Sequence, residues 1–283
     1  MTELVSLDYS AAGSDRRFVE SLRTTGFGVL NNHPLDLQLV SDIYQHWLAF
    51  FDSGRATEYT VNRESQDGFF SREDAESAKG FEHKDIKEYF HFYPWGQCPS
   101  ELRQELMQYY RSAHDLAATL LGWIEQYSPP DVAAGYLEPL SAMIVDSDIT
   151  LLRILHYPPL PSPPGQARQA ATRAAAHEDI NLLTILPISN VPGLQVRGKD
   201  DSWIEVPCGI DDIVVNIGDM LQEASGGYFP STTHRVVNPV NDADNVSRMS
   251  LPLFLHPRPD VKLSTRHTAG SYLDERLREL GVV

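Results

Sequence analysis

The sequence has few of the features that mark secreted, membrane-spanning or disulfide-stabilised proteins. Its 283 residues include two cysteines, Cys98 and Cys208, which stand far apart and outside any Cys-x-x-Cys pair. Disulfide frameworks and thiolate zinc sites therefore have no support. No segment has about 18 consecutive apolar residues, and the opening MTELVSLDYS lacks the basic and apolar regions of a signal peptide. These absences predict a cytoplasmic protein without a membrane segment.

Positive charge is also scarce. The 23 Lys and Arg residues are outnumbered by 39 Asp and Glu residues, which gives a formal net charge of -16. A chain with this charge repels phosphate backbones and anionic membranes, so neither a nucleic-acid nor a membrane partner is expected. The sequence also has no Gly-rich loop of the dinucleotide or Walker type and no Gly-x-Ser-x-Gly motif. Nucleotide-binding folds and α/β-hydrolases are thereby disfavoured.

The N-terminal half of the chain carries helical periodicity. The length allows a substantial buried core, and we expect a single domain over residues 1–283. Apolar residues recur three or four positions apart over 37–51, and again over 100–124 after Ser100, a plausible N-cap. This pattern predicts two long helices in an N-terminal helical and substrate-side region, 1–148.

From about residue 149 the pattern changes to short β-rich runs. ITLLRILHYP, INLLTILP, DIVVNIGD and RMSLPLFLHP are examples, and turn residues separate them. They predict a mainly β core over 149–258, either a sandwich or a barrel. The last residues, 259–283, include a helix that is expected to run from about Ala269 to Gly281. The fold class is therefore mainly β with flanking helices.

Residues 176–187, AHEDINLLTILP, place three titratable residues in front of an apolar run. In a buried strand, side chains alternate between faces, so His177 and Asp179 would share one face and Glu178 would point to the other. With a second imidazole from another strand, they would complete a 2-His-1-carboxylate facial triad. Such a triad leaves three coordination positions of Fe(II) open.

A second His-x-Asp sequence occurs at His83-Lys84-Asp85. The residues that follow each copy distinguish the two. About 55 to 60 residues beyond His177 stands His234 of STTHRVVNP, in a strand-like run after a glycine-rich turn, and nothing comparable follows His83. The spacing therefore favours the second copy, with His234, as the metal site.

Arg248 and Ser250 in RMSLPLFL lie two residues apart on an expected strand, so both side chains would face the same interior. A guanidinium fork matches a carboxylate, and a buried charge of this kind is expected to be paired. The pair is therefore a candidate carboxylate-binding site.

Taken in order, these motifs resemble one enzyme family. His177-x-Asp179, NIGDML, STTHRV and Arg248-x-Ser250 are similar to the isopenicillin N synthase-like family of non-haem iron oxygenases, most of which depend on 2-oxoglutarate. RTTGFGVLNNHP resembles the N-terminal segment of that family, with Pro34 in place of the usual glycine. DGFF and DIKEYFHF resemble two further family elements, which accounts for the first His-x-Asp as a non-metal motif. The resemblance covers nearly the whole chain.

The resemblance implies a double-stranded β-helix, or jelly-roll, core and an oxidative activity. Fe(II) would be bound by His177, Asp179 and His234, with no catalytic residue beyond this centre. The enzyme would use O2 and 2-oxoglutarate to hydroxylate, desaturate or cyclise a small molecule, with release of succinate and CO2. A monomer is the default expectation.

The resemblance also implies how 2-oxoglutarate would be held. Arg248 and Ser250 would bind its distal carboxylate, and Tyr157 of LHYPP matches a tyrosine that commonly helps. Two residues earlier, Leu155 stands where some plant members have asparagine. This difference affects a position that would contact 2-oxoglutarate.

Three alternatives remain open at this point. In an isopenicillin-N-synthase-like oxidase that uses no 2-oxoglutarate, the same Arg-x-Ser pair and tyrosine hold the carboxylate of the substrate. An ethylene-forming enzyme and a non-catalytic jelly-roll binding protein are the others, although an intact triad argues against the last. The substrate is not readable, because it would contact variable segments such as 62–92 and 161–176.

Overall fold

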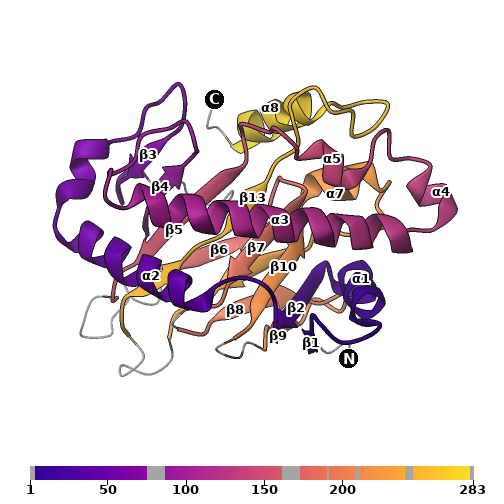
Figure 1. The fold of residues 1–283 in the computed structure, drawn as a ribbon, viewed down its shortest axis with the longest axis horizontal. Helices are drawn as coiled ribbons and strands as arrows, with labels where there is room; N and C mark the ends of the chain where they lie inside the picture. Colours follow the sequence, from indigo (N-terminus) through magenta and orange to yellow (C-terminus); the bar gives the residue numbers. More distant parts are fainter. Residues whose placement is uncertain are drawn as a thin grey trace.

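Two β-sheets form the centre of the molecule in the computed structural model (Figure 1). In spatial order the nine-stranded sheet contains β1 (Ser6–Asp8), β2 (Phe27–Asn31), β10 (Ile213–Ile217), β7 (Leu183–Pro187), β13 (Leu253–Leu255), β5 (Leu151–Tyr157), β4 (Glu88–Phe92) and β3 (Gly68–Phe70), with β12 (Arg248–Ser250) also paired to β5. The four-stranded sheet contains β6 (Ala174–His177), β11 (His234–Val236), β8 (Leu194–Arg197) and β9 (Trp203–Glu205). Every described strand pair except β1 with β2 is antiparallel. The expected jelly-roll core is confirmed.

The structure describes residues 4–74, 87–160, 173–189, 191–207, 209, 211–239 and 245–280. His83 and Asp85 of the first His-x-Asp and the second cysteine, Cys208, lie outside these residues. Most of the expected substrate-side segment 161–176 does too.

Strand β5 shows how the sequence divides the sheet into two faces. Leu152 and Ile154 are fully buried in the large core beneath the helices, whereas Leu155 and Tyr157 belong to a separate buried cluster on the opposite face. Arg153 alternates with Leu152 and Ile154, so its side chain also leaves the strand on that opposite face. This face of β5 lines the inside of the jelly roll.

Helices cover one face of the large sheet. Figure 1 shows α2 (Leu37–Asp52) and α3 (Arg103–Tyr127) lying across it. Helix α2 begins where Asp36 accepts hydrogen bonds from the backbone N–H groups of Gln38 and Leu39, which satisfies two donors of the first turn. Trp47 on its apolar stripe is fully buried, as the periodicity predicts.

The second predicted helix is confirmed, but its start differs. Ser100 is not the N-cap: Leu102 takes that position, and its backbone N–H bonds to Pro99 O in a preceding turn. The other helices among the described residues are α1 (Ser14–Thr25), the 3-10 helix η1 (Arg55–Tyr59), α4 (Pro130–Ala133), α5 (Leu140–Met143), α7 (Asp219–Ala224) and α8 (Ala269–Leu280). Among the described helices, none is long and apolar enough to cross a membrane.

The N-terminal region contributes more than the helical layer that the periodicity predicts. Strands β1 to β4, all from before residue 93, pair into the large sheet beside strands of the C-terminal core. Residues Phe27–Asn31 of the GFGVLNN segment form β2, which lies between β1 and β10. The N-terminal region is therefore part of the same sheet that carries β5, β7 and β10.

Candidate metal centre

His177, Asp179 and His234 come together at the end of the smaller sheet. His177 ends β6 and His234 begins β11, and the two residues are directly paired in the sheet. Their imidazole rings lie 4.3 Å apart between centroids. Asp179 Oδ1 lies 3.9 Å from His177 Nε2 and 3.8 Å from His234 Nε2. One carboxylate oxygen therefore faces both imidazoles.

The backbone fixes which imidazole nitrogen is free to coordinate. His177 Nδ1 lies 2.8 Å from the carbonyl oxygen of Ala175, and His234 Nδ1 lies 3.1 Å from that of Thr232. Because a carbonyl oxygen only accepts, each Nδ1 carries the proton and donates. Each Nε2 therefore turns its lone pair toward Asp179, which is the tautomer that metal-binding histidines adopt.

The second oxygen of Asp179 is held by two donors. Asp179 Oδ2 accepts a 2.7 Å hydrogen bond from Thr184 Oγ1 and a 2.8 Å bond from Asn216 Nδ2. Thr184 Oγ1 in turn accepts from Asn181 Nδ2 at 3.0 Å. All four side chains are buried. The network leaves Oδ1 as the oxygen that points at the two histidines.

The charge states of the three residues suit a cation. Burial raises the pKa of the Asp179 carboxyl, but the neighbouring His234 and His177 and the bonds from Asn216 and Thr184 outweigh it, so the net pKa is lowered. Removal of water from the ring, together with the neighbouring His234, lowers the pKa of His177 to about 4. At neutral pH the site therefore offers one carboxylate and an unprotonated imidazole at His177, although 43% of the His177 side chain stays accessible.

The spacing of the donor atoms also suits a metal ion. In the described part of the chain, the one group of His, Cys, Asp or Glu side chains placed to hold a metal is this triad, whose ligand atoms all lie within 4.8 Å of one another. Bonds of about 2.0 to 2.2 Å at right angles would put neighbouring ligand atoms about 3 Å apart. The two imidazoles and the carboxylate fit Fe(II) as a facial triad.

A candidate carboxylate-binding corner lies on the inner face of β5 and β12. Arg248 pairs with Tyr157 across these strands, and Ser250 pairs with Leu155. The Arg248 guanidinium lies 5.4 Å from the centroid of the Tyr157 ring, and its Nε donates to Val191 O at 3.2 Å. All four of the paired residues are buried. The structure thus brings Arg248, Ser250 and Tyr157 to one corner, as the sequence predicts.

A second guanidinium, Arg173, lies near this corner and was not predicted. It is fully buried, and its Nη2 donates to Val246 O at 2.8 Å. Its Nε and Nη1 atoms have no hydrogen-bond partner among the described residues. Burial, and then the positive charge of Arg248, lower the pKa of Arg173, while Tyr157 acts in the opposite direction. Two guanidinium groups therefore contribute positive charge to the same end of the interior.

Comparison with known proteins agrees with this arrangement. The family model described as the 2OG-Fe(II) oxygenase superfamily matches residues 149–257. A candidate oxygenase of known structure from Shewanella oneidensis is 56% identical, with both chains covered completely and a TM-score of 0.89. The chain belongs to the 2OG-Fe(II) oxygenase superfamily. It is therefore an oxidoreductase of the non-haem dioxygenase type, with Fe(II), 2-oxoglutarate and O2 as cofactor and co-substrates.

Two further relatives extend the comparison. Jasmonate-induced oxygenase 1 from Arabidopsis thaliana is 29% identical over 275 residues, which cover 92% of the oxygenase described here and 65% of that protein. The structure of JOX2 in complex with 2OG, Fe and JA is 24% identical, covers 93% of this chain and 77% of that one, and has a TM-score of 0.74. It shows the same fold.

One local prediction about the site is wrong. AHEDINLLTILP is not a single strand: β6 ends at His177, β7 begins at Leu183, and the two strands belong to different sheets. Asp179 lies on the connection, where its carbonyl oxygen accepts from Asp219 N at 2.7 Å. Glu178 is exposed and accepts from Thr233 Oγ1 at 2.7 Å, away from the metal ligands. Asp179 faces the histidines because of this turn and not because of strand alternation.

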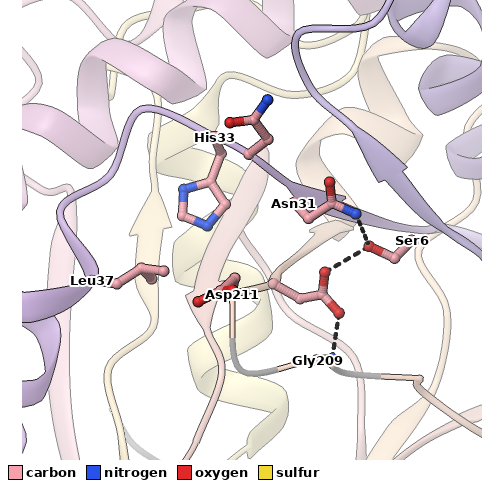
Figure 2. Close-up of a pocket in the computed structure, with 8 residues that line it drawn as sticks. Ser6, Asn31, His33, Leu37, Gly209 and Asp211 are labelled. Atoms are coloured by element: carbon pink, nitrogen blue, oxygen red, sulfur yellow. Dashed lines mark hydrogen bonds between the residues drawn. The ribbon is translucent and has the colours of Figure 1, made fainter.

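The oxygenase also has a surface pocket of about 760 Å³ that contains none of the triad residues. Figure 2 shows Ser6, Asn31 and His33 on its wall. Ser6 Oγ donates to Asp212 Oδ1 at 2.6 Å, and Asp212 Oδ2 accepts from the backbone N–H of Gly209. These bonds tie β1 to the segment that leads into β10, so the polar groups of this pocket serve the fold.

Proposed function

We propose that His177, Asp179 and His234 bind the Fe(II) with which the oxygenase oxidises a small molecule. The observation that carries this proposal is the approach of both Nε2 atoms to within 4 Å of one carboxylate oxygen, with both Nδ1 protons already bound to carbonyl groups. A structural histidine pair has no need of this common orientation. The carboxylate also neutralises part of the charge of a divalent cation.

We further propose that Arg248, Ser250 and Tyr157 hold the distal carboxylate of 2-oxoglutarate. Their burial supports a charge-assisted, water-free contact, since Arg248 is 3% exposed. The stacking of Tyr157 against the guanidinium orients the fork toward the interior. Leu155, beside Ser250, offers no hydrogen bond, so these three residues and the nearby Arg173 would supply the polar contacts at this end.

The protein residues act mainly by orientation and by exclusion of water. When bound, Fe(II) supplies the position at which 2-oxoglutarate and O2 react to give succinate, CO2 and an oxidised substrate. Thr184 and Asn216 keep Asp179 in one rotamer, and the carbonyl groups of Ala175 and Thr232 keep both imidazoles in one tautomer. Arg248 would fix the far end of 2-oxoglutarate, so that its keto-acid end lies at the metal.

The test is an anaerobic titration of the metal-free protein with Fe(II) and 2-oxoglutarate. Chelation by the co-substrate should produce a weak visible charge-transfer band, and admission of O2 should release succinate. Asp179→Ala should lose both signals and bind Fe(II) far more weakly, while Asp131→Ala, at an exposed position in α4, should match the wild type. Wild-type Fe(II) affinity in Asp179→Ala would show that the triad is not the metal site.

The same titration separates the isopenicillin-N-synthase-like alternative. An oxidase of that type would consume O2 with its substrate but would give neither the band nor succinate. A non-catalytic binding protein would give none of the three signals.

We also propose a monomeric cytoplasmic enzyme. The scarcity of cysteine supports the compartment, and a monomer is the default expectation. Light scattering after gel filtration tests the oligomeric state, and cell fractionation tests the compartment.

A further inference from the structure

Arg153 is a half-buried guanidinium on the inner face of β5 that the proposed chemistry does not use. Its Nε donates to His91 Nε2 at 2.9 Å. His91 Nδ1 lies 2.9 Å from the carbonyl oxygen of Gln66 and must donate to it, so Nε2 is free to accept from Arg153. This relay from Gln66 through His91 holds the guanidinium in one orientation.

Aromatic rings support the same guanidinium. Its central carbon lies 4.9 Å from the ring centroid of Tyr89 and 5.2 Å from that of Phe254. Behind it, Phe70 stacks on Tyr89 with centroids 4.7 Å apart. Tyr89, Phe70 and His91 are buried, whereas Phe254 and Arg153 are half-buried. Arg153 and Phe254 are therefore the members of this group that a ligand could contact.

The sheet register places Arg153 close to the metal centre. Strand β13 lies between β5 and β7, and its Phe254 pairs with Leu151 on one side and with Thr184 on the other. Thr184 donates to Asp179. With neighbouring strands about 4.8 Å apart, β5 lies about 10 Å from β7. The guanidinium is thus within the length of a small organic molecule from the triad.

The electrostatics agree with this placement. Burial is the main cause that lowers the pKa of His256 to about 4, and the charges of Asp179 and Arg153 both act on the same ring. His256 follows Phe254 by two residues on the inner face. Arg153 and Asp179 are therefore both close enough to the His256 ring for their charges to act on it.

Arg153 lacks an acidic partner within the part of the chain that the structure describes. No carboxylate forms an ion pair with it there, and its hydrogen bond to His91 uses one of the five guanidinium N–H groups. A positive charge that is partly removed from water is unfavourable unless an anion approaches it. The chain as a whole has a net charge of -16, so this cation lies in a protein that is otherwise rich in acidic groups. An anionic group of a ligand would satisfy it.

We propose that Arg153 binds the carboxylate of the primary substrate, which would be a small carboxylic acid with an apolar body. This inference rests on the proposed function of the triad. The planar fork of the guanidinium matches a planar carboxylate, and the half-buried ring of Phe254 supplies an apolar surface between that carboxylate and the metal. The carboxylate is bound at Arg153, and the carbon to be oxidised is thereby directed toward the metal centre. Arg248 remains the partner of 2-oxoglutarate.

The test compares carboxylic acids with their methyl esters as substrates of the Fe(II)-loaded enzyme. A panel of alkyl and arylalkyl carboxylic acids is assayed for equilibrium binding and for substrate-dependent succinate release. Acids should be preferred over the matched esters, and Arg153→Gln should raise the KM of a preferred acid about 10- to 100-fold with little change for its ester. Arg153→Lys keeps the charge but not the planar fork. Its KM for the acid should lie between those of the wild type and Arg153→Gln. Arg111→Gln, at an exposed position on α3, is the matched control and should behave like the wild type.

Several results would contradict the proposal. Equal use of acids and esters, or the absence of acid binding at millimolar concentration, would exclude a carboxylate site at Arg153. A rise in the KM for 2-oxoglutarate in Arg153→Gln, with the substrate KM unchanged, would assign the residue to the co-substrate instead. Failure of the proposed function is distinguishable, because the wild type would then lack the charge-transfer band and succinate release altogether. A folded Arg153→Gln protein should retain that band.

Discussion

Thr184 Oγ1 donates a 2.7 Å hydrogen bond to Asp179 Oδ2, so a residue on a central strand of the large sheet orients a proposed metal ligand that lies outside both sheets. The bond is buried, and Asn181 donates in turn to the same hydroxyl. Its effect is to leave one defined oxygen, Oδ1, toward the two imidazoles. Metal ligands that are held in this way lose affinity when the outer contact is removed.

Thr184→Val tests this contact because valine keeps the shape of threonine but cannot donate. We expect the affinity for Fe(II) to fall about 10- to 100-fold, with the fold retained. Anaerobic metal titration with a competing chelator measures the change. Thr119→Val, on the exposed face of α3, is the control and should have wild-type affinity. An unchanged affinity in Thr184→Val would show that the hydroxyl does not orient Asp179.

Arg248→Met should weaken the binding of 2-oxoglutarate. The loss of charge-assisted hydrogen bonds in a buried site should raise the KM for 2-oxoglutarate about 10- to 100-fold, while Fe(II) affinity stays near that of the wild type. Arg173→Met should raise the same KM by a smaller factor, since Arg173 adds positive charge at that end of the interior. Steady-state kinetics at saturating Fe(II) provide the measurement. If both variants kept the wild-type KM, 2-oxoglutarate would have to bind elsewhere.

The buried His91 makes stability depend on pH. Burial, followed by the charge of Arg153, holds the pKa of His91 well below its usual value near 6.5. The unfolded chain therefore binds a proton more readily than the folded one, so the contribution of His91 to stability is complete above about pH 6.5 and decreases as the pH falls below it. Protonation would also remove the acceptor of the Arg153 hydrogen bond.

We therefore expect the Tm to fall between pH 7 and pH 5, and to fall less steeply in His91→Gln. Thermal unfolding followed by circular dichroism at matched ionic strength measures both slopes. Gln45→Ala, at an exposed position on α2, removes no titratable group and should keep the wild-type slope. Identical slopes in the wild type and His91→Gln would contradict this assignment.

Gly218 is a site where any side chain would be harmful. A Cβ atom built there would lie 2.1 Å from Asn181 O and 2.4 Å from Asn181 Oδ1. Gly218→Ala should therefore lower the free energy of unfolding and displace Asn181 from the network around Asp179. Gly122→Ala is a contrasting control, because nothing lies within 4 Å of its added Cβ on helix α3. That control should gain about 0.5 to 1 kcal/mol of stability, since alanine favours a helix over glycine. Chemical denaturation of the two variants measures both effects, and equal stability would be inconsistent with the close approach at Gly218.

Much of the fold could be predicted because it depends on local periodicity. The apolar spacing over α2 and α3, and the short β-rich runs after residue 149, each reflect one buried face. The N-terminal strands were not predicted: β1 and β3 have three residues each, β2 and β4 have five, and they are separated by the helical segments that dominate this region. Their place in the large sheet is decided by long-range pairing.

The proposed metal ligands were predicted from their order in the sequence, whereas their geometry was not. The sequence AHEDINLLTILP gives no sign that the chain leaves one sheet after His177 and enters the other at Leu183. Arg153 and Asn216 were missed as functional residues for a related reason. Each is a polar residue that interrupts an apolar run, LLRIL in β5 and IVVNI in β10, and that interruption was the available signal. Which face it occupies, and what it meets there, depends on the register with neighbouring strands.

The five residues from Glu178 to Leu182 join a strand of the four-stranded sheet to a strand of the nine-stranded sheet, and the histidines stay on the smaller sheet while Asp179 is anchored to the larger through Thr184 and Asn216. A cation bound at the triad would therefore cross-link the two sheets. Resistance to proteolysis around residues 178–182 should therefore rise when the metal is bound.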